Sequence, residues 1–159
     1  MSDVESVERV IASPPGPIFD LLADPSRHQD IDGSGSVRDA KDAPQRLSLG
    51  AKFGMSMKVG VPYSMVSEVV EFEENRRIAW QTRPPSSFGA KIGGGRIWRY
   101  ELEPVEGGTL VRESWDISQE KMKFVVSPAR NRTRKAMTQT LERIEEIVTG
   151  AGTSPPAAE

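Results

Sequence analysis

The segment that decides the fold reads SPARNRTRKAMTQTLERIEEIVTG and runs from Ser127 to Gly150. Ser127 suits an N-terminal cap, Pro128 suits the first helical position, and Gly150 stands just past the end. Four apolar residues fall within about 40° of one another on a helical wheel: Met137, Leu141, Ile144 and Val148. The segment therefore predicts one long amphipathic helix, whose apolar face must pack against another element.

The chain ahead of this helix alternates with a period of two, which is typical of strands. Trp98, Tyr100 and Leu102 share one side of a strand in Gly95–Glu103, and Glu106–Gly108 is a hairpin turn. Short turns between consecutive strands predict an antiparallel meander. We expect six such strands in residues 37–115, in addition to a first strand in residues 3–13.

Two short helices are expected after the first strand. Residues 14–17 contain three prolines, which end the strand, and residues 18–22 have helical spacing. Asp24 then suits the cap, and Pro25 the first position, of a second short helix that carries His28. The predicted fold class is α+β, with a seven-stranded curved antiparallel sheet wrapped around the long C-terminal helix.

Length and composition narrow the class of protein. A chain of 159 residues predicts one domain, which we place at residues 1–149, followed by a disordered tail at 150–159. A formal charge of −2 argues against a nucleic-acid-binding protein. With no cysteine and one histidine, we expect no metal site and no disulfide.

The sequence carries no signal for a cofactor or for membrane insertion. The glycine clusters at residues 33–35 and 93–95 match neither the dinucleotide fingerprint nor the phosphate loop, so we expect no cofactor. No stretch approaches 18 apolar residues, and Met1–Glu5 is acidic. We therefore expect a cytoplasmic protein without integral membrane association.

A sheet of seven strands offers more apolar area than one helix can cover, so a cavity between the two is expected. Methionines, which re-pack around different ligands, are available to line it beside large aromatic residues. The alternative is that these side chains fill an ordinary core. The expected lining comprises Phe53, Met55, Met57, Trp80, Trp98, Tyr100, Trp115 and Phe124, with Met137 and Leu141 on the helix.

Three segments carry a resemblance to a known family: residues 15–25, residues 70–80, and Tyr100–Pro104 followed by Gly107–Thr109. With the predicted order of elements, they resemble the helix-grip fold of the START-like SRPBCC superfamily, most closely its polyketide cyclase/dehydrase family. The resemblance covers residues 4–148, nearly the whole chain. It implies a hydrophobic ligand, such as a lipid, polyketide or quinone, in the cavity under the last helix.

His28 is the only histidine, and its ordinary pKa lies near neutral pH. It lies where the short helices return toward the sheet, and Asp30 and Asp32 could orient its ring. It could then act as a general acid or base on a carbonyl-containing ligand. The alternative, which we favour from the sequence, is a solvated histidine on a polar short helix.

Glu113 stands between Val111 and Trp115 on one face of the last strand. On the concave face its carboxylate would enter an apolar cavity, which would raise its pKa and make it a usable acid. On the convex face it would simply be solvated. The apolar neighbours favour the inward orientation. Tyr100 could supply a phenol donor, although a buried tyrosine usually satisfies a backbone partner.

Two arginines could meet an anionic group. By alternation, Arg96 is on the same face of its strand as Trp98 and Tyr100. It could therefore face Glu113 or a ligand carboxylate; the alternative is that it lies in water. Arg130 lies near the helix start, where it could bind an anionic head group or project into solvent. A wider basic cluster could meet an acidic lipid surface or RNA, although a solvated face is favoured: Lys121, Lys123, Arg130, Arg132, Arg134 and Lys135.

Three functions remain open from the sequence. The first is the binding of a hydrophobic small molecule between the sheet and the last helix. The second is a cyclase or dehydratase acting on a polyketide-like chain in the same cavity, with His28, Glu113 or Tyr100 as acid–base groups. The third is a protein-interaction module with a filled core.

Overall fold

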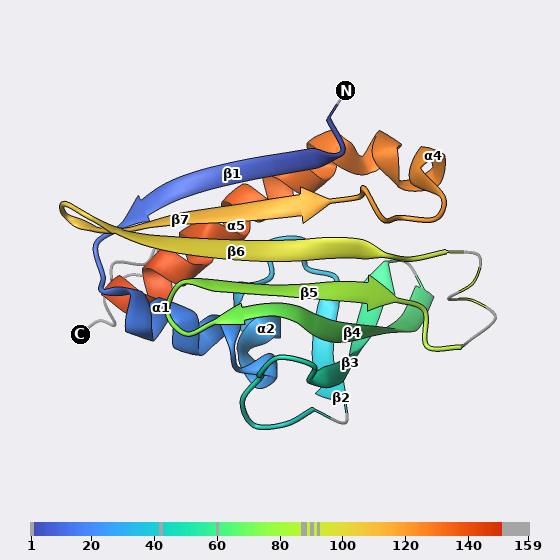
Figure 1. The fold of residues 1–159 in the computed structure, drawn as a ribbon, viewed down its shortest axis with the longest axis horizontal. Coiled ribbons are helices and arrows are strands. Elements are labelled where there is room, and N and C mark those ends of the chain that lie inside the picture. The colour runs from blue at the N-terminus through green and yellow to red at the C-terminus, as the bar shows by residue number, and fades with distance from the viewer. Residues whose placement is uncertain are drawn as a thin grey trace.

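The described residues contain seven strands, coloured from blue to orange along the chain in Figure 1: β1 (Val4–Ile11), β2 (Val37–Lys41), β3 (Lys52–Val59), β4 (Val61–Glu73), β5 (Arg77–Arg83), β6 (Arg96–Val105) and β7 (Gly108–Asp116). They form one antiparallel sheet in the order β1-β7-β6-β5-β4-β3-β2. Strands that follow one another from β2 to β7 are neighbours, as the short turns predicted. The first strand, β1, pairs with β7 and forms one edge of the sheet.

The helical elements are α1 (Pro15–Leu22), η1 (Pro25–Arg27), α2 (His28–Ile31), α4 (Lys123–Val126), η2 (Ser127–Ala129) and α5 (Arg130–Thr149). The long helix α5 lies across one face of the sheet, and α1 lies near its C-terminal end (Figure 1), whereas the turn after α2 meets the middle of α5. The helix-grip architecture and the helices after the first strand are confirmed. Within the described residues, no helix combines the length and apolar character needed to cross a membrane.

This computed structural model describes residues 2–41, 43–59, 61–86, 89, 91 and 93–150. Of the expected disordered tail at 150–159, only Gly150 lies within the described residues. Gly150 has a φ of 69° and caps α5 in the left-handed conformation. Glycine adopts this conformation without the steric cost of a Cβ, as the sequence predicted for the end of the helix.

The start of the long helix differs from the sequence prediction. Ser127 is the first residue of the 3-10 turn η2, and Pro128 lies within that turn. The α-helix begins at Arg130, and its N-cap, Ala129, makes no side-chain capping hydrogen bond. The second short helix also differs, because Asp24 caps the 3-10 turn η1 through the amide of Ser26 and α2 begins only at His28. Cap residues therefore indicated where the chain turns but not the type of turn.

Two clusters of buried side chains form the core between the sheet and the helices. The larger cluster combines α1, the sheet and the C-terminal half of α5, for example through Phe19, Ile78 and Ile144. The smaller consists of Trp115, Ile117 and Met137 under the N-terminal half of α5. Val7 and Trp98 pack against both clusters, so the two are continuous.

Candidate functional site

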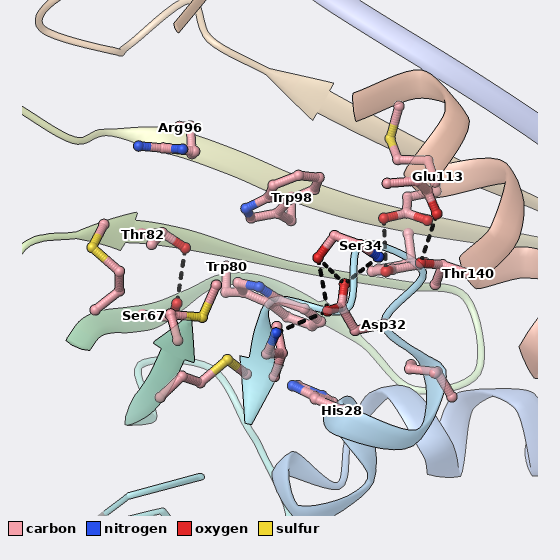
Figure 2. Close-up of a pocket in the computed structure, with 18 of the residues that line it drawn as sticks. His28, Asp32, Ser34, Ser67, Trp80, Thr82, Arg96, Trp98, Glu113 and Thr140 are labelled. Atoms are coloured by element: carbon pink, nitrogen blue, oxygen red, sulfur yellow. Dashed lines mark hydrogen bonds between the residues drawn. The ribbon is translucent and has the colours of Figure 1, made fainter. Parts of the chain in front are cut away.

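A cavity of about 200 Å³ lies between the curved sheet and α5 (Figure 2). Its walls come from α2, the turn that follows α2, strands β2 to β7 and the middle of α5. Four methionines contribute flexible apolar surface: Met55, Met57, Met65 and Met137. The volume exceeds the roughly 150 Å³ of an engineered cavity that holds benzene, and it lies below the roughly 300–1,000 Å³ of typical ligand sites.

Aromatic rings form the central wall of the cavity. Trp80 of β5 and Trp98 of β6 are cross-strand partners, so their side chains leave the sheet on the same face. The His28 ring stacks on Trp80 with 4.8 Å between the ring centroids and an interplanar angle of 20°. Phe53 meets both rings edge-on from behind, at centroid distances of 5.5 Å from His28 and 5.7 Å from Trp80.

His28 is held by a backbone contact. Its Nε2 lies 2.8 Å from the carbonyl oxygen of Leu22, which can only accept, so Nε2 carries the proton. Burial lowers the pKa of His28, and the imidazole is therefore neutral near pH 7. Its Nδ1 is then a bare acceptor, and this atom is buried without a hydrogen-bond partner among the described residues.

A buried acid pair lies at the inner end of the cavity. Tyr100 of β6 and Glu113 of β7 are cross-strand partners, and the Tyr100 hydroxyl donates to Glu113 Oε2 at 2.8 Å. Glu113 is only 3% exposed. Burial raises the pKa of Glu113 to about 8, although the Tyr100 hydrogen bond opposes this shift and the charge of Asp32 adds to it. Burial also raises the pKa of Tyr100 well above its usual value.

The turn after α2 closes the cavity against α5. The Gly33 amide donates to Thr140 Oγ1 at 2.8 Å, and Arg143 Nη1 donates to the Asp32 carbonyl at 2.6 Å. A Cβ on Gly33 would lie 2.2 Å from the Ala136 carbonyl oxygen, so only glycine allows this approach. The Asp32 carboxylate accepts from the Ser34 amide, the Ser34 hydroxyl and the Val37 amide, which shapes the turn.

A cation lies at the opposite end of the cavity. Arg96, four residues before Tyr100 on β6, lines the cavity beyond Trp98 (Figure 2). Its Nε is 3.4 Å from Oε2 of Glu120, a buried carboxylate whose Oε1 accepts from the Gly94 amide. The cavity therefore has a charged end at Arg96, an aromatic middle, and an end with buried hydroxyl groups at Glu113.

Comparison with known proteins identifies the family. A family model described as polyketide cyclase / dehydrase and lipid transport matches residues 4–149. The chain belongs to this family. Membership supports, in general terms, the binding of a hydrophobic ligand, and the cavity lies where the family's resemblance implied, under the C-terminal helix.

The chain is also similar to curated relatives and to solved structures. An uncharacterized protein of Mycobacterium tuberculosis strain H37Rv is 35% identical over 108 residues, which make up 67% of this chain and 44% of that protein. The chain thus spans less than half the length of the curated relatives it matches.

Two solved structures, both at 15% sequence identity, share the fold of this chain. A protein from Chromobacterium violaceum has a TM-score of 0.70, and the match covers 93% of this chain and 98% of that one. A protein from Arthrobacter aurescens has a TM-score of 0.71, with coverage of 95% and 89%.

Most of the residues that the sequence singled out meet at this cavity. Glu113 faces inward, and Arg96, Trp98 and Tyr100 share the same face of β6. The structure brings together nine of these candidates: His28, Met55, Met57, Trp80, Arg96, Trp98, Tyr100, Glu113 and Met137. Their roles toward a ligand stay predictions.

Five candidates for ligand binding are not among the residues that line the cavity. Phe53, Trp115 and Leu141 are fully buried in the core behind the cavity wall. Phe124 lies on α4 and is 74% exposed, because this short helix extends away from the sheet. Arg130 Nη1 is 3.1 Å from Glu5 Oε1 and its guanidinium lies over the Trp115 ring, so Glu5 compensates its charge outside the cavity lining.

The solvated histidine that the sequence favoured is wrong. His28 is 4% exposed, because the short helix α2 turns its first residue under the sheet. Asp30 does not orient the ring: it pairs with Arg27 at 2.7 Å on the outer side of α2. Asp32 does line the cavity, but its carboxylate is bonded within its own turn.

Several lining residues were not proposed as site residues from the sequence. Strand β4 contributes Met65 and Ser67, whose alternation could have identified them. Thr140 follows Met137 at helical spacing and could have been found in the same way. Ser34 had no such signal, because it lies in a turn whose contact with α5 is purely tertiary.

Proposed function

We propose that the protein binds a small hydrophobic molecule, with lipid-, polyketide- or quinone-like chemistry, in the cavity between the sheet and α5. The observation that carries this proposal is the cavity itself, with Trp80 and Trp98 on one wall and four methionines around it. Its volume suits a ligand portion of one or two rings. Movement of the methionine side chains would admit longer molecules. The presence of this cavity also argues against the third function, a protein-interaction module with a filled core.

Native mass spectrometry on freshly purified protein, followed by solvent extraction, tests the proposal directly. A stoichiometric apolar adduct would support it and reveal the class of ligand. Tetralin, a bicyclic hydrocarbon, serves as a defined probe in isothermal titration calorimetry. The absence of both a co-purified molecule and tetralin binding up to its solubility limit would contradict the proposal.

A pair of tryptophan variants separates the cavity from the core. Trp98→Ala removes a lining ring, and we expect it to weaken tetralin binding at least tenfold. Trp115→Phe changes a buried ring outside the cavity, and we expect it to lower stability by about 1–3 kcal/mol with tetralin affinity retained. Equal loss of affinity in the two variants would contradict this location of the site.

A second function is favoured by the acid–base groups that line the same cavity. On a bound β-hydroxy ketone, His28 Nδ1 would accept the proton α to the carbonyl as that C–H bond breaks. The Tyr100–Glu113 pair would protonate the departing hydroxyl as the C–O bond breaks. A C=C bond forms and water leaves, which is the dehydration expected of a dehydratase.

The ketone 4-hydroxy-4-phenylbutan-2-one tests this second function, because its dehydrated product is a conjugated enone that absorbs in the ultraviolet. A rate above that of buffer, lost in His28→Gln and in Glu113→Gln with probe binding retained, would support catalysis. A rate equal to that of buffer would leave binding as the function of the cavity.

A further inference from the structure

The Tyr100–Glu113 pair has one more hydroxyl proton than its own hydrogen bond uses. A protonated Glu113 and Tyr100 carry one O–H each, and a single hydrogen bond of 2.8 Å joins them. Whichever oxygen donates in that bond, the other proton has no acceptor within the pair. Among the described residues, Glu113 Oε1 is buried and has no hydrogen-bond partner. A buried donor without an acceptor lowers the stability of the folded protein by roughly 1–3 kcal/mol.

The surroundings favour the protonated form of Glu113 at neutral pH. Its side chain forms no ion pair with a cation in the described part of the chain, and an unpaired buried carboxylate is strongly disfavoured. Arg96 is four residues along β6 from Tyr100, roughly 13 Å away at the rise of a strand, and faces Glu120. Burial and the nearby Asp32 raise the pKa of Glu113 to about 8, in agreement with this geometry.

Two acceptors that line the cavity are already engaged, and a third, His28 Nδ1, forms no hydrogen bond to the pair. The Asp32 carboxylate receives hydrogen bonds from its own turn, and Thr140 Oγ1 receives one from Gly33. Both the pair and Asp32 line the cavity, so a molecule inside it can reach this end. The missing partner is therefore an acceptor that the ligand brings.

We infer that the inner end of the cavity binds an uncharged carbonyl oxygen of the ligand through the spare hydroxyl proton of the Tyr100–Glu113 pair. This inference rests on the proposed binding function and specifies the chemistry of its ligand. A ketone, quinone or ester oxygen accepts the proton, while the adjoining rings or chain lie against Trp80 and Trp98. A carboxylate is disfavoured at this end, because it would bring a negative charge beside Asp32 without a cation.

A matched pair of probes tests the inference. The aryl ketone α-tetralone and the hydrocarbon tetralin share one skeleton and differ in the carbonyl oxygen. Calorimetric titration of the wild-type protein should give an affinity for α-tetralone roughly tenfold higher than for tetralin, the size expected for one net hydrogen bond. Equal affinities would overturn the inference and leave the binding function intact. Binding of neither probe would overturn the proposed function itself.

Variants of the pair give a distinctive pattern. Tyr100→Phe leaves the Glu113 proton, and Glu113→Leu leaves the Tyr100 proton, so each single variant should still prefer the ketone. The double variant Tyr100→Phe/Glu113→Leu retains neither proton. Its affinity for tetralin should persist, and its preference for α-tetralone should disappear or reverse, because the carbonyl would lose its hydration without a partner.

The double variant also controls for folding. Replacing both members of a buried hydrogen-bonded pair by apolar groups is often close to neutral for stability. Retained tetralin binding would confirm that its cavity is intact. A double variant that binds tetralin and still prefers the ketone tenfold would overturn the inference, because the donor would then lie elsewhere.

Discussion

At the scale of single residues, Glu113 combines two properties that the sequence could not supply together. It is buried on the concave face, and among the described residues its side chain has one hydrogen-bond partner, Tyr100. Its pKa of about 8 therefore reflects loss of hydration more than any specific partner. Such a group makes the stability of the folded chain depend on pH.

The direction of that dependence follows from proton binding. Above pH 4.5 the unfolded chain loses the Glu113 proton while the folded chain retains it until about pH 8. Glu113 thus contributes stability below pH 4.5 that is lost as the pH rises to about 8. Glu113→Gln does not titrate, so its stability relative to wild type should rise by several kcal/mol between pH 5 and pH 8.

Urea unfolding at the two pH values measures this difference. Glu106→Gln changes an exposed carboxyl in the β6–β7 turn and is the control. We expect its stability relative to wild type to change little with pH. Parallel pH profiles for Glu113→Gln and wild type would show that Glu113 is ionised in the folded chain, and the acid pair would then have no spare proton.

At the scale of elements, the turn after α2 is fastened to α5 by a backbone approach that only glycine permits. Gly33→Ala would place a Cβ 2.2 Å from the Ala136 carbonyl oxygen and 2.7 Å from the Thr140 amide nitrogen. Both obstacles are helix backbone, which cannot move aside without displacing α5. We expect a loss of about 1–3 kcal/mol in stability and weaker tetralin binding, because this contact closes the cavity.

Gly16→Ala is the matched control for Gly33→Ala. Gly16 lies in α1, and a Cβ there would meet nothing within 4 Å. Alanine is the better helix former, but Pro17 follows and its ring disfavours the helical conformation of a preceding alanine, so stability should change by no more than about 1 kcal/mol in either direction. Thermal unfolding of both variants measures the contrast. A Gly33→Ala variant as stable as Gly16→Ala would contradict the close approach of turn and helix.

At the scale of the whole molecule, the two core clusters are joined by side chains that belong to both. Val7 and Trp98 pack against each cluster, so loss of one cluster exposes part of the other. We expect one cooperative unfolding transition, with the same midpoint by far-ultraviolet circular dichroism and by tryptophan fluorescence. Two separated transitions would indicate that the smaller cluster under the start of α5 unfolds alone.

The periodic parts of the fold could be predicted because their signals are local. The alternation in residues 95–115 identified a hairpin, and the helical spacing from Met137 to Val148 identified the long helix. The same alternation placed Trp98 and Tyr100 on one face with Arg96, and all three line the cavity. Turn types at Ser127 and Pro25 were less accessible, since α and 3-10 turns share the same cap residues.

Which residues line the cavity depends on where α5 crosses the sheet. Trp98 and Trp115 are cross-strand partners on the same face, yet only Trp98 lines the cavity. Trp115 lies under the N-terminal half of α5, where Met137 and Ile117 cover it. The alternation along a strand predicts the face of the sheet from which a side chain projects. It does not predict whether that side chain meets a helix or a cavity.

The sequence by itself determined the order of elements, their apolar faces and the family. The order and the apolar faces depend on spacing along the chain, and the family on the resemblance of three of its segments. Only the tertiary structure decided that His28 is buried, that Glu113 and Tyr100 share a hydrogen bond, and that Arg96 lies at the opposite end of the cavity. These facts depend on contacts between strands and helices far apart in the chain, and on the loss of water that those contacts impose.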